Sequence, residues 1–265
     1  MLNRRHFLAA LAAGTAAGIA GCAGGSRTAG STHAAANQHP TPVISAAAIA
    51  APPMPVKVPL PGDGMLRQLP TPAGDRVFAL TVDDGCNSDV IRAYTEFARD
   101  SGIRLTYFVN GIYEGWTQHA GLLRPLVDSG QIQLGNHTWS HPDLTSLSEN
   151  EIDEQLTKNA TFLKNTYGVD GRPFYRPPYG FHNETVDKVA RDLGYQCTTM
   201  WNGSFGDSSV VTPQYIVRMA HKYFQPNAVV IGHLNHPSVT QVYAQLVDAI
   251  KQNNVRTVTL NDVFI

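Results

Sequence analysis

Two adjacent carboxylates follow a short run of apolar, β-prone residues. The run is Val77–Val82, the acids are Asp83 and Asp84, and Gly85 comes next. Neighbouring carboxylates repel each other when both are ionised, unless a cation or a basic side chain lies between them. Gly85 allows a turn through which both acids can face one pocket, although successive strand residues point to opposite faces. One acid could then bind a metal while the other transfers a proton; the alternative is a pair of acids at a helix N-terminus.

Two histidines lie four residues apart further along the chain, at His137 and His141, and Pro142 follows. Imidazoles at this spacing can converge on one cation if the segment makes a helical turn, and Pro142 predicts that such a turn ends at once. Taken alone, His-x-x-x-His in a loop is more often a coincidence than a metal site. One carboxylate and two imidazoles, with room for water and substrate, are however a recognised catalytic zinc set.

Three further polar side chains could act near such a cation. Arg176 stands before two prolines in the segment Tyr175–Gly180, which is stiff enough to hold a guanidinium and a backbone N–H in fixed directions. The alternative for this segment is a rigid surface turn. Asp207 lies in a later loop, and His233 follows the apolar run 229–231, where an imidazole is well placed to donate a proton.

The elements that must position these residues alternate between strands and helices from about Arg76 onward. We expect strands near 77–82, 105–109, 131–134, 174–175, 195–200, 228–231 and 255–258, and helices over 89–100, 122–128, 148–167, 183–193, 213–224 and 238–252. Such alternation predicts one α/β domain with about seven parallel strands, arranged either as a barrel or as an open doubly wound sheet. In both forms the loops at the carboxyl ends of the strands build the active site, and the polar residues described above follow strands.

The N-terminal 21 residues have the pattern of an export signal. Arg4 and Arg5 precede the apolar stretch 7–20, which is too short to span a bilayer as a mature helix. The pair resembles a twin-arginine signature, and the residues before Cys22 resemble a bacterial lipobox. We therefore expect lipidation of Cys22 and a location on the outer face of the cell membrane, or secretion; the alternative is an ordinary signal peptide that contains a cysteine.

The remaining chain divides into a linker and a folded domain. Residues 22–75 are rich in Ala, Ser, Thr, Gly and Pro, which predicts a disordered spacer, and 76–265 form the expected catalytic domain. Cys86 and Cys197 are expected as two separate thiols, since one pair would not make a disulfide framework. The formal net charge of −1 excludes the basic surface of a nucleic-acid binder and favours a neutral or mildly polar substrate.

Five ordered motifs together resemble the polysaccharide deacetylases, also called the NodB-homology domain or carbohydrate esterase family four. They are 81–85 (TVDDG), 137–142 (HTWSHP), 176–180 (RPPYG), Asp207, and 231–233 (IGH). The resemblance spans about 76–258, and the first three motifs are close matches in order and spacing. It implies a distorted (β/α) barrel with about seven strands, and an exported hydrolase that removes N-acetyl groups from cell-wall glycan or a chitin-like oligomer.

The resemblance also implies a role for each matching residue. Asp83 would be the catalytic base, and Asp84, His137 and His141 would bind Zn²⁺, or alternatively Co²⁺ or Ni²⁺. Arg176 would orient the base, and the backbone N–H of Tyr179 would help to hold the oxyanion. His233 would be the acid, tuned by Asp207.

Two departures from the family pattern bear on the substrate. The fourth motif usually reads Asp-x-x-Asp-Trp, whereas Ser204 and Ser208 stand here in place of the first acid and the tryptophan. Ile231 and Gly232 replace bulkier apolar residues in the fifth motif. Two alternative functions follow: an O-acetyl sugar esterase that uses the same site, and a catalytically weak wall-glycan-binding lipoprotein.

Overall fold

The computed structural model describes residues 54–62, 64–72 and 74–265. The export signal at 1–21, the lipidation site Cys22 and the linker as far as residue 53 lie outside the described residues. Within the described part of the chain, no helix is both long and apolar enough to cross a membrane.

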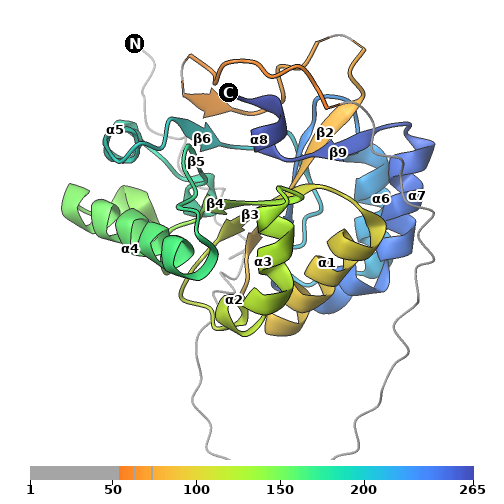
Figure 1. The fold of residues 1–265 in the computed structure, drawn as a ribbon, viewed down its shortest axis with the longest axis horizontal. Helices are drawn as coiled ribbons and strands as arrows, with labels where there is room; N and C mark the ends of the chain where they lie inside the picture. Colours follow the sequence, from red (N-terminus) through yellow and green to blue (C-terminus); the bar gives the residue numbers. More distant parts are fainter. Residues whose placement is uncertain (1–53, 63, 73) are drawn as a thin grey trace, which may run out of the picture. The chain divides into compact units, whose positions relative to one another are not determined.

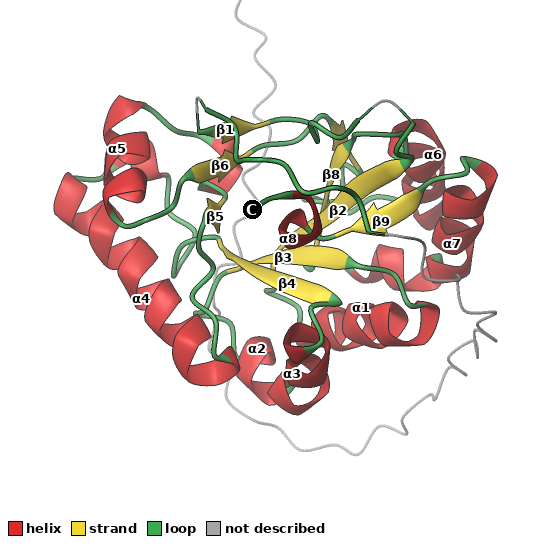
Figure 2. Cartoon of the chain, turned by 45° about the horizontal axis from the view of Figure 1, so that its top comes forward, coloured by secondary structure: helices red, strands yellow, loops and turns green. Residues whose placement is uncertain are grey.

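A curved parallel sheet forms the centre of the fold (Figures 1 and 2). Its strands run β1-β6-β5-β4-β3-β2-β8-β7 across the sheet, with β9 also paired to β2, and every pairing between named strands is parallel. The strands are β1 Met65–Leu66, β2 Val77–Asp84, β3 Leu105–Val109, β4 Ile132–Asn136, β5 Phe174–Tyr175, β6 Cys197–Thr199, β7 Gly203–Ser204, β8 Val229–His233 and β9 Arg256–Val258. Because β1 and β7 are the two ends of this path, the expected distorted barrel is confirmed as an incomplete one.

The sheet has nine strands where about seven were expected. The additional strands, β1 and β7, have two residues each, too few to show a hydrophobic period. β1 also falls inside the segment that we assigned to the linker. Leu66 and Leu69 from that segment are buried in the core, and Val58 forms an isolated bridge with Phe264, so the folded part begins before Arg76.

Helices cover the outer face of the sheet, as Figures 1 and 2 show. They are α1 Ser88–Ser101, α2 Gly115–Gln118, α3 Ala120–Asp128, α4 Glu149–Tyr167, α5 Glu184–Asp192, α6 Pro213–Tyr223 and α7 Tyr243–Gln252. The short helix α8 Leu260–Val263 instead lies on the inner side of the sheet (Figure 2). Ser148 and Glu151 form a capping box at the start of α4, and Gly168 ends that helix in a left-handed conformation. The helix expected over 238–252 is divided at Val242, whose φ of −130° leaves the helical region.

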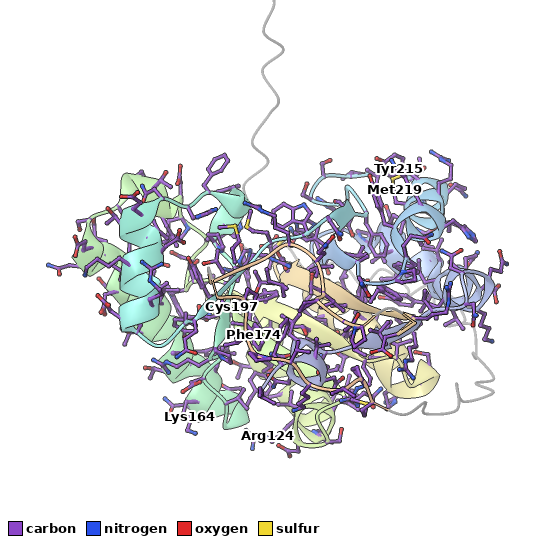
Figure 3. All side chains as sticks on the ribbon, turned by 90° about the horizontal axis from the view of Figure 1, so that it is seen from above. Arg124, Lys164, Phe174, Cys197, Tyr215 and Met219 are labelled. Atoms are coloured by element: carbon purple, nitrogen blue, oxygen red, sulfur yellow. The ribbon has the colours of Figure 1, made fainter. Side chains whose placement is uncertain are left out.

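Alternation along β2 supplies two hydrophobic cores at once. Phe78, Leu80 and Val82 pack toward the helices in the larger cluster. Val77 and Ala79 face the barrel interior, in a second cluster that also holds Phe174 and Cys197 from β5 and β6 (Figure 3). Strand alternation then places Thr81 and Asp83 on the interior side as well, because they continue the odd-numbered series.

Candidate active site

Asp83 is the penultimate residue of the most extensively paired strand. β2 pairs with β3, β8 and β9, and Asp83 itself stands opposite Phe108 on β3 and His233 on β8. Its carboxylate is buried, with Oδ2 lying 3.6 Å from Nε2 of His137. The strand therefore continues through both acids, two residues further than expected, and brings Asp83 to the carboxyl end of the sheet.

Asp84 reaches the same place through an unusual backbone conformation. In a regular strand its side chain would point away from that of Asp83, but Asp84 has a φ of 76° and Gly85 a φ of 108°. A Cβ at Gly85 would stand 2.4 Å from Nε1 of Trp116, so the turn requires glycine. The Trp116 indole donates to the Asp84 carbonyl at 3.1 Å and holds this turn against the core.

His137 and His141 meet Asp84 at one point. Nε2 of each imidazole lies 3.3 Å from Oδ1 of Asp84. Nδ1 of His137 lies 2.7 Å from the Arg176 carbonyl, which can only accept, so Nδ1 carries a hydrogen and Nε2 is the ring nitrogen that faces the cluster. Asp84, His137 and His141 are the one group of three or more such side chains, among the residues described, whose ligand atoms all lie within 4.8 Å of one another.

The loop that carries the two histidines is held in a strained conformation. Thr138 and His141 have φ values of 70° and 61°, which β-branched and bulky residues adopt rarely. Asn110 donates to the carbonyls of both His137 and Thr138, and the Thr138 hydroxyl accepts from the His141 N–H at 3.1 Å. The expected single turn that breaks at Pro142 is thus replaced by a loop with two left-handed residues.

The donor set fits a divalent cation. Oδ1 of Asp84 is buried and has no hydrogen-bond partner, which is costly unless a cation or water satisfies it. Burial raises the pKa of Asp84, but the adjacent His137, when its ring is protonated, outweighs burial and holds that pKa well below its usual range. Burial, and then the charge of His137, lower the pKa of His141 to about 4, so its ring is neutral and able to ligate at pH 7.

Arg176 lies fully buried behind Asp83. Nη1 donates to Oδ1 of Asp83 at 2.6 Å and to the Thr81 hydroxyl at 2.9 Å. Nε and Nη2 donate to the carbonyls of Thr199 and Met200, at 2.9 and 3.2 Å. The guanidinium fork therefore fixes one oxygen of Asp83 and leaves the other toward His137.

His233 and Asp207 form a second, separate pair beside the cluster. Nδ1 of His233 lies 2.9 Å from Oδ1 of Asp207, and the His233 N–H donates to Oδ2 at 3.2 Å. Burial disfavours the imidazolium, but the hydrogen bond and charge of Asp207, with the charges of Asp84 and Asp83, raise the pKa of His233 to about 9. His233 is the last residue of β8 rather than the residue after it.

The two departures in the later motifs leave this pair intact. Ser204 belongs to β7, and its hydroxyl accepts from the Gly206 N–H in the turn that leads to Asp207. A Cβ at Gly232 would stand 2.9 Å from the Phe205 ring, so the absence of a side chain at Gly232 makes room for that ring. The substitutions therefore reshape the wall around the pair without displacing it.

Tyr179 lies next to the histidine loop. Its backbone is left-handed, with a φ of 60°, inside the short 3₁₀ turn Pro178–Gly180. The half-exposed ring packs edge-on against His141 at 4.5 Å, and its hydroxyl approaches the His141 carbonyl at 3.5 Å. Phe181, also exposed, lies 5.8 Å from the Tyr179 ring. These rings give the cluster an aromatic rim.

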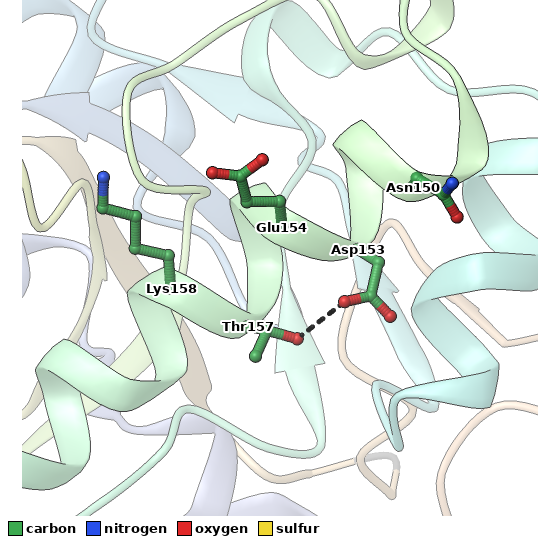
Figure 4. A pocket seen from close by; sticks show the side chains of 5 residues that line it. All are labelled: Asn150, Asp153, Glu154, Thr157 and Lys158. Carbon is green, nitrogen blue, oxygen red and sulfur yellow. Dashed lines mark hydrogen bonds between the residues drawn. The ribbon is translucent and has the colours of Figure 1, made fainter.

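A surface hollow on α4 carries no comparable chemistry. It is lined by Asn150, Asp153, Glu154, Thr157 and Lys158 (Figure 4). All five side chains come from one helix, and Asp153 accepts a hydrogen bond from Thr157 at 3.2 Å. This arrangement is that of a solvated helix face.

The structure thus brings together the residues singled out from the sequence and adds others. Thr81, the first residue of the motif 81–85, accepts from Arg176. Trp116 and Asn110 hold Asp84 and the histidine loop, and the sequence carries no spacing signal for either of these two. Asn235 also joins the site, donating to Oδ2 of Asp84 at 2.6 Å. Cys86 and Cys197 occupy separate surroundings, the first beside Asn235 and the second in the interior core.

Comparison with known proteins gives this site a family context. Residues 71–198 match the family described as polysaccharide deacetylase, a segment that includes the cluster and Arg176 but ends before Asp207 and His233. A peptidoglycan-N-acetylglucosamine deacetylase, PgdA, of Listeria monocytogenes is 25% identical over 205 residues, which cover 77% of this chain and 42% of that protein. The chain therefore spans less than half the length of this relative.

Solved structures share the fold at low identity. One is a peptidoglycan N-acetylglucosamine deacetylase, with a TM-score of 0.67 and 23% identity over 76% of this chain and 92% of the other. Another is a CE4 family pseudoenzyme from Bacillus anthracis, with a TM-score of 0.65 and 20% identity over 75% and 68% of the two chains. The same half-barrel thus occurs in active and inactive proteins. Residues 71–198 therefore resemble a polysaccharide deacetylase domain, and the described part of the chain shares the fold of these solved structures.

Proposed function

We propose that the protein removes N-acetyl groups from a polysaccharide of the bacterial cell wall, with a divalent metal at Asp84, His137 and His141. The observation that carries the proposal is the separation of two acids at the end of β2. Asp84 faces the histidines, whereas Asp83 is held by Arg176 and stays outside the three-residue cluster. An extracellular location fits this substrate, and the lipid anchor at Cys22 remains part of the proposal.

The cluster would hold zinc in preference to cobalt or nickel, on availability, since this ligand set suits each of them. When bound, such an ion polarises a water molecule and the acetyl carbonyl. The three residues contribute neutral imidazoles and one carboxylate, which leaves positions open for water and substrate.

Asp83 is the proposed general base. Its Oδ1 is engaged by Arg176, so Oδ2, on the His137 side, is the oxygen free to take a proton from water. Arg176 holds that carboxylate in place through the buried contact of 2.6 Å, which is a positioning role. The Tyr179 backbone N–H, in its left-handed turn next to His141, is the proposed donor to the oxyanion.

His233 is the proposed general acid. The raised pKa keeps the ring protonated at neutral pH, so that it can deliver a proton to the departing amine. Proton delivery matters more for an amide than for an ester, because an amide anion is a very poor leaving group. The strength of the Asp207–His233 pair therefore favours N-deacetylation over the alternative of O-deacetylation.

An acetate-release assay tests this function. The zinc-loaded protein is given N-acetylated and O-acetylated oligosaccharides, with and without a chelator. We expect the N-acetylated substrates to be the better ones and the chelator to stop turnover. Activity that survives full removal of metal would refute the proposed cofactor.

Two variants test the assigned roles. Asp83→Asn should lower kcat by about 10²–10⁴-fold while retaining zinc, because the amide cannot accept a proton from water. His137→Ala should lose both zinc and activity, whereas His221→Gln, on the exposed face of α6, should lose neither. Near-normal acetate release by Asp83→Asn would show that the base is misassigned. An inactive wild-type protein that binds glycan would favour the wall-binding alternative.

A further inference from the structure

The two carboxylate oxygens of Asp84 have different surroundings. Oδ1 faces both imidazoles, at 3.3 Å from each Nε2, and has no hydrogen-bond partner in the described part of the chain. Oδ2 accepts a short hydrogen bond of 2.6 Å from Nδ2 of Asn235. One oxygen is therefore satisfied by the protein, and the other is left for a ligand.

The backbone places Asn235 at this position. Beyond the end of β8, the Leu234 N–H donates to the Asp83 carbonyl at 3.0 Å, and the Asn87 N–H donates to the Leu234 carbonyl at 3.1 Å. These bonds continue the pairing between the two strands past His233. Asn235 is thus fixed by main-chain contacts to the same segment that carries the acids.

The orientation of the Asn235 amide follows from its neighbours. An ionised carboxylate only accepts hydrogen bonds, so the amide nitrogen must face Asp84 and the amide oxygen must face away. On that far side, the Cys86 thiol donates to Oδ1 of Asn235 at 3.2 Å. A rotated amide would set its oxygen against the carboxylate and its N–H₂ against the thiol, which is a weaker arrangement on both sides.

We propose that Asn235 is a positioning residue for the metal site: its amide, oriented by Cys86, occupies one oxygen of Asp84 and turns the other toward His137 and His141. This inference rests on the proposed function, because it concerns the ion that the cluster would bind. Among the described residues, Asn235 makes no hydrogen bond to either imidazole, so it would act through Asp84 alone.

Metal affinity is the direct measure of this role. Residues that orient a ligand typically change metal affinity by about 10–100-fold when they are replaced. Asn235→Leu keeps a similar side-chain volume but removes the donor, so we expect its dissociation constant for Zn²⁺ to rise by a factor in this range. Cys86→Ser retains a donor and should bind Zn²⁺ nearly as tightly as the original protein, whereas Cys86→Ala should bind it more weakly.

The experiment is a competition titration of Zn²⁺ against a chromophoric chelator, on the full chain and its variants. The visible spectrum of the Co²⁺-loaded proteins is a second readout, which a change in the geometry of Asp84 would alter. Asn253→Leu is the matched control, since Asn253 also donates through its amide, to the carbonyls of His221 and Phe224 at 3.0 and 2.9 Å, on α6 and at its end. The control should leave both Zn²⁺ affinity and the Co²⁺ spectrum unchanged.

The outcomes separate this inference from the proposed function. A wild-type protein that binds no Zn²⁺ would overturn the metal site and the inference with it. If the wild-type protein binds Zn²⁺ and Asn235→Leu binds it with the same affinity, the inference about Asn235 is overturned and the proposed metal site stands. If circular dichroism shows that Asn235→Leu is unfolded, Cys86→Ala decides the question. Unchanged Zn²⁺ affinity in Cys86→Ala would refute the proposal that Cys86 orients the Asn235 amide and thereby positions Asp84.

Discussion

Replacing Arg176 with lysine should destabilise the protein although it keeps the positive charge. A lysine ammonium can still approach Asp83, but it cannot reproduce a planar fork that donates in three directions. The carbonyls of Thr199 and Met200, which accept from Nε and Nη2 in the native protein, would lose their donors in a buried site. Each unsatisfied buried acceptor costs about 1–3 kcal/mol, so the expected loss is about 2–6 kcal/mol.

Arg176→Met should destabilise the protein more than Arg176→Lys does, because it also leaves Asp83 as a buried charge without a partner. Breaking a buried ion pair in this way costs about 3–5 kcal/mol in addition to the two carbonyls. A double variant with Asp83→Asn should then regain part of the loss, since neutral Asn removes the unpaired charge. The predicted order of stability is the original protein, then Arg176→Lys, then the double variant, with Arg176→Met last.

Urea unfolding followed by circular dichroism measures these differences. With a slope of about 2 kcal/mol per molar urea, the loss expected for Arg176→Lys lowers the midpoint by about 1–3 M. An unchanged midpoint for Arg176→Lys would show that the carbonyl contacts contribute nothing. Equal stability of Arg176→Met and the double variant would refute the buried-charge argument, even if both are less stable than the original protein.

Three further predictions concern the acid and the turn. Asp207→Asn removes the main contact that raises the pKa of His233, so the alkaline limb of the kcat–pH profile should move to lower pH; an unmoved limb would exclude His233 as the acid. The raised pKa of His233 contributes stability that is fully present below about pH 6.5 and is lost as pH rises through about 9. The free energy of unfolding of Asp207→Asn should therefore depend less on pH between these two values than that of the original protein. Gly85→Ala would place a Cβ 2.4 Å from Trp116 in a left-handed residue, and thermal unfolding should show a lower Tm than for Gly121→Ala, where nothing lies within 4 Å of the added carbon.

The position of the site residues could be predicted because active sites of parallel α/β folds lie at the carboxyl ends of the strands. Asp83, His137 and Arg176 all follow or end strands, and neighbouring parallel strands deliver their carboxyl ends to one edge. The order of the five motifs, through their resemblance to one family, then related these distant segments to one another. The helix caps at Ser148 and Thr212 are local features of the sequence, since each side chain accepts from the backbone N–H three positions away.

The remaining features depend on contacts that no local pattern encodes. β1 and β7 form because the longer strands β6 and β8 pair with them. Two residues are too few to show the hydrophobic alternation from which a strand is predicted. The left-handed turn at Asp84 depends on Trp116, which is 32 positions away, and the Asn235–Asp84 bond joins residues 151 positions apart. Such pairs become visible only when the register of the sheet is known.

The pairing of β2 with three other strands has a consequence for how the molecule opens. Amides of β2 lie in the most extensively paired strand of the sheet, so we expect them to exchange with deuterium only through global unfolding. In the loop 137–141, the N–H groups of Thr138, Ser140 and His141 donate to side-chain oxygens rather than to a neighbouring strand, so we expect these amides to exchange through smaller local openings. Asp83 would then stay fixed on β2 while local openings of the loop displace His137 and His141. Mild denaturant should therefore release the metal at a lower concentration than the one that unfolds the barrel.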